Sequence, residues 1–356
     1  MEDSTRAKLS SDQLAQLGRA PAHHKYRDVS ALFRLANNTG VSCYFNAMIQ
    51  SLGSLSSFVA WLKDNKDRHP EELWTTLCTL LIRDNNLPTS QLPILDTIYL
   101  HQALVKKRSG SGSNISINRQ EDIQEGLLLL LDSLSPEADK VFRLWYLEEI
   151  TCVCGHREQR VAFETVVAIE LDTNPTTPEQ FADVLKSFSE YREGHRCDKC
   201  SRTNGSQKFL KFTRTLIQSS EVIVVYYKKY TSKQQRFFPV DLDLEFKDYL
   251  GRPKRHSYQI VAQVEHRGTM RGGHYWARVK RPKPPGYQAR RTQMLKERLE
   301  KEPNNERVRS LLKDWEEEAE YPCTYFHLND SELSFPIAGV LPTEETYMVF
   351  YHLFKE

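Results

Sequence analysis

The stretch that organises the rest of the chain is Asn38-Thr-Gly-Val-Ser-Cys43-Tyr-Phe-Asn46. Apolar residues follow the cysteine at helical spacing, so the pattern predicts that Cys43 opens an amphipathic helix with a buried apolar face; they are Phe45, Met48, Ile49, Leu52 and Leu55. A thiol in the first turn of a helix lies among unpaired backbone N–H groups at the positive end of the helix dipole, and both favour the thiolate. Cys43 is therefore a candidate nucleophile, although a lone cysteine in such a helix is more often a plain core residue.

The turn before Cys43 contains Gly40, with Thr39 and Ser42 as candidate helix caps. Asn38 lies one loop upstream of the cysteine. Its side-chain amide could donate a hydrogen bond to the oxyanion that forms when Cys43 attacks a carbonyl carbon. Asn38 is therefore a candidate oxyanion donor.

Composition narrows the class of protein. The chain has 356 residues, and 49 basic against 47 acidic residues give a net charge of +2, which argues against a nucleic-acid binder whose affinity rests on net charge. No apolar run approaches the length of a membrane span, and the N-terminus lacks the apolar core of a signal peptide. We therefore expect a monomeric intracellular protein of the cytoplasm or nucleus, in a host cell if a pathogen secretes it. In such a reducing compartment the seven cysteines are reactive, metal-binding or buried thiols.

The order of periodicities predicts an α+β fold. Residues 1 to 30 are polar and form a lead-in, and the segments Phe58 to Leu62 and Leu73 to Ile82 have helical spacing. From Glu221 onward the sequence changes to short β-branched and aromatic runs, which predict a largely antiparallel sheet. The predicted strands are Val222 to Tyr227, Arg236 to Val240, Tyr258 to His266, His274 to Val279, Thr324 to Leu328 and Tyr347 to Leu353.

A histidine lies at the start of one of these strands, in His266-Arg-Gly-Thr-Met-Arg-Gly-Gly-His274-Tyr-Trp. Gly272 and Gly273 permit backbone angles closed to other residues, and they also permit close approach of an extended ligand. Asn329 and Asp330 follow at the end of a later strand. A cysteine, then a histidine, then an amide or carboxylate is the constellation of a thiol hydrolase, in which the imidazole takes the thiol proton and the third group orients the imidazole.

Two carboxylates, Asp122 and Glu125, share one face at the start of a leucine-rich helix. They could bind a basic ligand. The plainer interpretation is an acidic first turn that complements the helix dipole. The spacing alone favours the plainer interpretation.

Four cysteines come in two close pairs, which is typical of a structural zinc site. The pairs are Cys152 with Cys154, and Cys197 with Cys200. The first pair has one intervening residue where two are usual, so either the geometry is distorted, or His156 replaces a cysteine, or the site has decayed.

These motifs resemble the ubiquitin-specific proteases. Asn38 to Asn46 is similar to their cysteine box, and Tyr258 to Tyr275 with Asn329 and Asp330 is similar to their histidine box. Gln120 to Glu125 and the two cysteine pairs are similar to the family's intermediate boxes, and Val222 to Tyr230 is similar to its central strand. Thr346 to Tyr351 resembles a further part of the histidine box. All these segments occur in family order, over about residues 31 to 354.

The resemblance implies a papain-like cysteine peptidase shaped like a hand: a helical thumb over about 31–150, zinc-ribbon-like β fingers over about 151–220 and an antiparallel β palm over about 221–356. It implies hydrolysis of the isopeptide or peptide bond after the C-terminal glycine of ubiquitin or a ubiquitin-like modifier, with ubiquitinated proteins as substrates. It implies no cofactor for catalysis, and a structural zinc ion remains a hypothesis. A catalytically weak ubiquitin-binding or scaffold protein of the same fold is the alternative.

Residue by residue, the resemblance implies that Cys43 is the nucleophile, His274 the general base, Asn329 the orienting residue and Asn38 the oxyanion donor. Asp330 is the second candidate for the orienting role. By the same matching, Asp122 and Glu125 bind the basic C-terminal tail of ubiquitin, which reverses the interpretation from spacing alone. Gly272, Gly273 and Tyr275 are further expected ubiquitin contacts, and Cys152, Cys154, Cys197 and Cys200 are the expected metal ligands.

Some positions depart from the family pattern without removing a catalytic group. Leu35-Ala36 stands where Gly-Leu is usual, Val41-Ser42 replaces Asn-Thr, Gly126 replaces an aromatic residue or leucine, and Lys229-Tyr230 replaces Arg-Phe. A charged insert at about 281–320 is also outside the family core. It predicts two helices, about Tyr287 to Lys301 and Asn304 to Glu318, which either pack on each other as a surface hairpin or bind a partner.

Overall fold

The structure is a computed structural model. It describes residues 29–83, 87, 91–108, 116, 118–135, 137–152, 154–170, 175–192, 197, 210–228, 236–269, 272–317, 323–334 and 342–354. These residues form two compact units. The described residues of the first, here called the Cys43 unit, lie within His24–Ala138 and Ile260–Phe350; those of the second, the four-stranded unit, lie within Asp139–Gln259 and Tyr351–Glu356. The domain boundaries expected from the sequence stay predictions.

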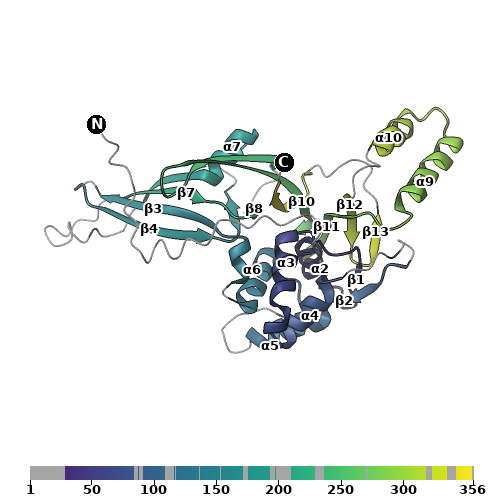
Figure 1. Cartoon of the computed structure of the whole chain (residues 1–356), viewed down its shortest axis with the longest axis horizontal. Coiled ribbons are helices and arrows are strands. Elements are labelled where there is room, and N and C mark those ends of the chain that lie inside the picture. The colour runs from purple at the N-terminus through teal and green to yellow at the C-terminus, as the bar shows by residue number, and fades with distance from the viewer. Residues whose placement is uncertain are drawn as a thin grey trace. The chain divides into compact units, whose positions relative to one another are not determined.

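The first half of the Cys43 unit is helical. Its helices gather together in Figure 1 and are α2 (Cys43–Leu52), α3 (Ser56–Asn65), α4 (Glu72–Leu81), α5 (Ile98–Arg108) and α6 (Ile123–Leu134), with a short 3-10 turn at Lys66–Arg68. A second 3-10 turn, Ala138–Val141, spans the boundary between the two units. The short strands β1 (Arg34–Ala36) and β2 (Ile94–Asp96) pair in parallel. The α-helical N-terminal third predicted from the sequence is confirmed.

Helix α2 is more deeply placed than its amphipathic spacing predicted. All ten of its residues are buried, including Asn46 and Gln50. Their side-chain amides donate to the backbone oxygens of Ala36 at 2.9 Å and Phe33 at 3.0 Å, which offsets the cost of burying polar groups. The helix that begins with Cys43 is thus held on all sides.

A largely antiparallel sheet completes this unit, as the sequence predicted. Its order is β13-β12-β11-β10-β14, formed by β13 (Glu332–Ser334), β12 (Cys323–Asn329), β11 (Gly272–Pro282), β10 (Pro253–Thr269) and β14 (Thr346–Leu353), of which β10 and β14 run on into the four-stranded unit. Along β11 buried residues alternate with half-buried ones, and the strand lies against α2. The strand that carries His274 and the helix that carries Cys43 are therefore direct neighbours.

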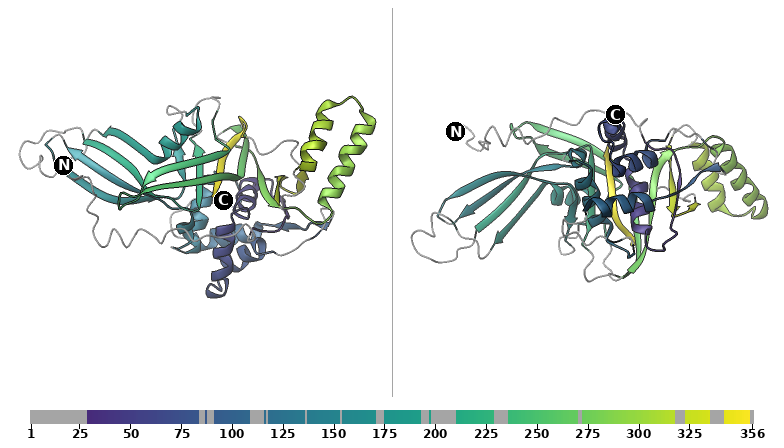
Figure 2. Two further views of the ribbon diagram at one scale, coloured as in Figure 1. Left: turned by 45° about the horizontal axis from the view of Figure 1, so that its top comes forward. Right: turned by 90° about the horizontal axis from the view of Figure 1, so that it is seen from below.

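The charged insert forms two helices, α9 (Tyr287–Lys301) and α10 (Glu306–Glu317), which run side by side in Figure 1 and in both views of Figure 2. Leu295 and Val308 are buried, whereas Met294 is 46% exposed. The two helices thus pack on each other, as the hairpin interpretation expected, but the exposure of Met294 departs from it.

The four-stranded unit is built around an antiparallel sheet of order β4-β3-β7-β6. Its strands are β3 (Leu144–Cys152), β4 (Arg157–Glu164), β6 (Ser187–Arg192) and β7 (Leu210–Gln218). The same unit contains α7 (Pro178–Lys186), the parallel pair β5 (Val167–Ile169) and β8 (Val222–Tyr227), and β9 (Asp241–Lys247), which pairs with the first part of β10. Among the described helices, none is long and apolar enough to cross a membrane.

One local prediction was wrong. Arg236 to Val240 is not a strand, because Phe238 packs on Tyr227 with ring centroids 5.1 Å apart while Pro239, which has no N–H to donate, accepts the Tyr351 hydroxyl at 2.8 Å. Gly272 and Gly273, which permit unusual backbone angles, do not have a positive φ, whereas Gly268 on the paired strand does. A Cβ on Gly273 would lie 2.5 Å from His266 Nε2 and 2.6 Å from the Arg267 oxygen, so glycine is needed there for close strand packing.

Candidate active site

Cys43 is the first residue of α2, as the sequence predicted, with Ser42 at the N-cap. Neither predicted cap closes the helix. The Ser42 hydroxyl donates to Asn37 Oδ1 at 2.8 Å, the Ser42 backbone N–H donates to the same oxygen at 3.1 Å, and Thr39 accepts only from the Val41 N–H at 3.4 Å. Asn37, which the sequence reasoning missed, therefore fixes the loop that leads into the cysteine.

The Cys43 side chain is buried, with a residue exposure of 1%. Burial raises the pKa of the thiol above its ordinary value, whereas the backbone N–H of Tyr275 donates toward the sulfur and lowers the pKa; the Asp330 carboxylate adds a smaller increase. The backbone N–H groups of Tyr44 and Cys43 at the helix N-terminus also lower the pKa, in the direction expected from the sequence, but the net direction is upward because burial is the largest cause. Loss of hydration outweighs the helix dipole, and the sulfur needs a base to become a nucleophile.

His274 directly precedes Tyr275, whose backbone N–H donates toward the Cys43 sulfur. His274 Nε2 is 2.5 Å from Asn329 Oδ1. This contact joins β11 to the end of β12. The His274 ring also stacks on Trp276, with centroids 6.0 Å apart and planes 26° apart. The imidazole is thus held by an amide and by an aromatic face.

Asp330 has a different set of partners from Asn329. Its carboxylate accepts from Asn37 Nδ2 at 2.9 Å and from Asn46 Nδ2 at 2.7 Å, and its backbone oxygen accepts from the Leu35 N–H at 3.2 Å. It has φ +52°, the positive value seen for this one non-glycine residue in the described part of the chain. Asp330 therefore ties the end of β12 to the cysteine loop and to α2.

The side-chain amides of Asn38 and Gln120 bind different partners. Asn38 Nδ2 donates to Asp96 Oδ2 at 2.9 Å, in an exposed pair. Gln120, a residue the sequence reasoning did not single out, donates from Nε2 to Cys43 Sγ at 3.5 Å, and its Oε1 accepts from the Gly273 N–H at 2.9 Å. Gln120 thus bridges the cysteine and the strand of His274. In the sequence, the one feature that could have pointed to Gln120 is its position at the start of the segment with the paired carboxylates.

Asp122 is the N-cap of α6, where its Oδ1 accepts from the Gln124 N–H at 2.7 Å. Its Oδ2 accepts from the Tyr347 hydroxyl at 2.7 Å. The Asp122 charge and burial together raise the pKa of Tyr275, burial being the larger cause, so Tyr275 lies near this carboxylate. Glu125 is in the same first turn and is exposed. Asp122, Glu125 and Tyr275 therefore belong to the same unit as Cys43.

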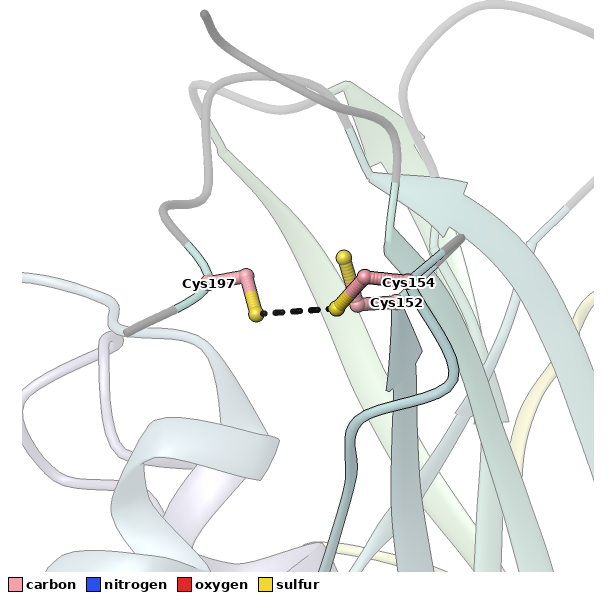
Figure 3. A group of neighbouring side chains, drawn as sticks. All are labelled: Cys152, Cys154 and Cys197. Carbon is pink, nitrogen blue, oxygen red and sulfur yellow. Dashed lines mark hydrogen bonds between the residues drawn. The ribbon is translucent and has the colours of Figure 1, made fainter. Parts of the chain in front are cut away.

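Three of the predicted metal ligands meet in the four-stranded unit. Cys152, Cys154 and Cys197 offer sulfur atoms that all lie within 4.8 Å of one another, and Figure 3 shows Cys154 and Cys197 facing each other with 3.8 Å between the sulfurs. Cys197 Sγ is also 3.5 Å from His156 Nδ1. The positive φ of Gly155 makes the tight turn between β3 and β4 that brings the first pair and His156 together.

This donor set fits a zinc ion, because thiolates and one imidazole are ligands that zinc prefers in tetrahedral sites. The shortened first pair is accommodated by the turn, so both Cys152 and Cys154 reach the cluster. Cys200 lies outside the described residues. The three cysteines could therefore hold a metal ion, and His156 lies next to one of them, Cys197.

Comparison with known proteins identifies the family. The sequence matches the ubiquitin carboxyl-terminal hydrolase family over residues 35–351. The chain belongs to this family. Among curated proteins it is 24% identical over 241 residues to ubiquitin carboxyl-terminal hydrolase 29 of Mus musculus, a match that covers 54% of this chain and 25% of that relative.

Solved structures agree on the fold. Two structures of the SAGA deubiquitinase module Ubp8/Sgf11/Sus1/Sgf73 match, one bound to monoubiquitin and one to ubiquitin aldehyde. Their TM-scores are 0.57 and 0.59, at 15% and 16% identity, and each match covers 97% of this chain and 73% of the other. The α+β ubiquitin-specific protease fold predicted from the sequence is thus confirmed for this hydrolase family member.

Proposed function

We propose that this chain is a thiol-dependent deubiquitinase that hydrolyses the bond after the C-terminal glycine of ubiquitin or a ubiquitin-like modifier. The observation that carries the proposal is the pair of contacts at the start of β11. His274 bonds Asn329 through Nε2, and the next residue, Tyr275, donates its backbone N–H toward Cys43 Sγ. These two contacts support the proposal, because His274 and Cys43 lie in one compact unit and adjacent residues of β11 bind Asn329 and the sulfur.

The chemistry follows from that arrangement. His274 Nδ1 takes the thiol proton, and the thiolate attacks the carbonyl carbon of the terminal glycine. Asn329 accepts the Nε2–H bond, so it fixes the tautomer and stabilises the imidazolium that forms. The imidazolium then gives the proton to the leaving amine, and water, activated by the same imidazole, hydrolyses the thioester.

Because the pKa of Cys43 is raised, the base has to remove the thiol proton before or during attack. A thiol that is mostly protonated near neutral pH reacts slowly, so proton transfer to His274 during attack is what makes the residue a nucleophile. Asn38, Asp122, Glu125, Gly272 and Gly273 keep their expected roles in oxyanion and ubiquitin binding as part of the proposal. Structural zinc at the cysteine cluster would support the four-stranded unit and takes no part in the reaction.

The test is hydrolysis of a ubiquitin C-terminal fluorogenic amide. Cys43→Ala should abolish turnover, and His274→Ala should lower kcat by roughly a hundred- to ten-thousand-fold, the usual contribution of a general base. Cys78→Ala is the matched control, because Cys78 is a half-buried cysteine on α4 outside the site. Turnover by Cys43→Ala near the wild-type rate would overturn the proposal, as would a wild type that binds ubiquitin without turnover, which is the scaffold alternative.

A further inference from the structure

We propose that Gln120 supplies a catalytic hydrogen bond to the oxyanion formed on the carbonyl that Cys43 attacks. This inference rests on the proposed function, and it adds a donor to the site beyond the one expected at Asn38. The side-chain amide of Gln120 contacts the Cys43 sulfur, whereas that of Asn38 binds Asp96.

The orientation of the Gln120 amide is fixed by its two contacts. Oε1 accepts from the Gly273 backbone N–H at 2.9 Å, so the NH2 group is the end that faces Cys43 Sγ, at 3.5 Å. A backbone N–H can only donate, and this removes the ambiguity between the oxygen and nitrogen ends of the amide. The donor is therefore preorganised, which is what electrostatic stabilisation of a transition state requires.

The position also suits the atom that develops charge. When the sulfur bonds to the carbonyl carbon, the carbonyl oxygen lies two bonds from the sulfur, so a donor already within 3.5 Å of the sulfur can reach it. Asn38 is placed differently, because its Nδ2 is held by the Asp96 carboxylate at 2.9 Å. Asn38 would have to leave that charged partner before it could donate to the oxyanion, whereas Gln120 need only exchange the sulfur for the oxygen.

The step balances as follows. The Cys43 thiolate forms the S–C bond, and the C=O π pair moves onto oxygen, where the Gln120 N–H donates to it. Collapse of the intermediate reforms C=O and breaks the C–N bond. The departing amine takes its proton from the His274 imidazolium, so no further reactant is needed.

The experiment compares two ubiquitin probes, one whose reaction forms an oxyanion and one whose reaction does not. The first is the C-terminal fluorogenic amide; the second carries a C-terminal bromoethylamide, which the thiolate alkylates by displacing bromide. Gln120→Met keeps the size of the side chain and removes the donor. We expect it to lower kcat on the amide by roughly a hundred- to a thousand-fold, with the rate of alkylation at saturating probe unchanged.

Two further variants complete the design. Gln120→Glu keeps an acceptor for the Gly273 N–H but cannot donate as a carboxylate, so it should also lose turnover on the amide. Gln293→Ala is the surface control, because this glutamine is exposed on α9, where its Nε2 donates to Glu297 Oε1 at 2.8 Å. It should hydrolyse and alkylate at wild-type rates.

The outcomes separate this inference from the function on which it rests. Equal slowing of Gln120→Met on both probes would show that Gln120 only positions the thiol, and wild-type turnover by Gln120→Glu would show that holding Gly273 is its role. Faster turnover by Gln120→Met would show that the Gln120 bridge obstructs the substrate. Each of these overturns the oxyanion assignment while the wild type remains active. A wild type inert toward both probes would instead overturn the proposed function and this inference with it.

Discussion

Asn329 and Asp330 are neighbours in the chain that bind different partners. Asn329 bonds the His274 ring, whereas the Asp330 carboxylate holds Asn37 and Asn46. Asn329→Ala should therefore lower kcat, by less than His274→Ala because the base itself remains, and leave stability nearly unchanged. Asp330→Ala should instead lower the free energy of unfolding by about 1–3 kcal/mol, the usual cost of leaving buried donors unpaired.

Urea unfolding and turnover of the two variants, measured side by side, check this division. If Asp330→Ala keeps wild-type stability and loses more kcat than Asn329→Ala, the orienting residue is Asp330.

His101 gives the Cys43 unit a dependence on pH. It is 1% exposed, its Nε2 lies 3.0 Å from the Tyr44 hydroxyl, its ring stacks on Phe45 at 4.7 Å, and burial lowers its pKa to about 4 from an ordinary 6.5. The unfolded state therefore binds a proton that the folded state does not, between these two pH values. The free energy of unfolding is therefore unaffected by His101 protonation above about pH 6.5 and falls as the pH approaches 4, by on the order of 3 kcal/mol.

Urea unfolding between pH 7 and 4.5 measures this loss. His101→Gln, which does not titrate, should flatten the profile; an unchanged pH profile in this variant would assign the acid sensitivity to other groups.

At the residue scale the sequence suggested candidate reacting groups but not their supports. Cys43, His274, Asn329 and Asp330 were singled out because a thiol hydrolase needs those residue types in that order, and their catalytic roles stay predictions. Asn37, Asn46 and Gln120 were missed as site residues, because an amide in a loop or a helix has no spacing signal and its partner is set by tertiary contacts.

Between elements, Arg281 links the strand of His274 to the helix of Cys43. It is fully buried in β11, its Nη2 donates to the Gln50 oxygen in α2 at 2.5 Å, and its Nη1 donates to the Ser54 hydroxyl. Burial lowers its pKa to about 9. A Cβ added at Gly53 would lie 2.5 Å from Arg281 Nη2, so the buried guanidinium requires glycine at this position.

Arg281→Met should therefore lower the free energy of unfolding by about 1–3 kcal/mol, since the Gln50 oxygen and the Ser54 hydroxyl lose a buried partner. Turnover should also fall, because α2 and β11 would no longer be held in their relative positions. Thermal unfolding compared with Arg291→Met, a half-buried arginine on α9, checks the effect. Equal stability of the two variants would contradict a linking role for Arg281.

The cysteine cluster makes a second prediction at the scale of elements. If it holds zinc, elemental analysis should find about one ion per chain, and Cys197→Ser should lose it, because one ligand of a tetrahedral site is removed. Hydrogen exchange should then rise in β3, β4 and β7 while α2 stays protected. Cys323→Ser is the matched control, since this half-buried cysteine lies on β12 in the other unit. A metal-free wild type with full activity would mean that the site has decayed.

Elements were predicted well where periodicity was strong. The helices α3, α4, α9 and α10 and the strands β8, β10, β11, β12 and β14 lie where the spacing placed them. The strand predicted at Arg236 to Val240 is absent, because an aromatic run can pack its rings in a core without forming backbone hydrogen bonds to a neighbouring strand. Strand β9 was not predicted, because it alternates buried leucines with charged residues and so lacks the β-branched character used to find strands.

For the whole molecule, the proposed reaction needs only the residues of the Cys43 unit. The nucleophile, the base, the orienting amide, Gln120, Asp122 and Glu125 all lie within it. The four-stranded unit contributes the cysteine cluster. We therefore expect metal loss to affect ubiquitin binding more than the chemical step, because the Cys43 unit carries every reacting group.

The most direct measurement is the reaction of the purified chain with ubiquitin that carries a C-terminal electrophile, followed by intact mass and peptide mapping. The account predicts one covalent ubiquitin per chain, attached at Cys43, with no adduct in Cys43→Ala and an undiminished adduct in Cys78→Ala. Absence of an adduct in the wild type, or attachment at a different cysteine, would contradict it.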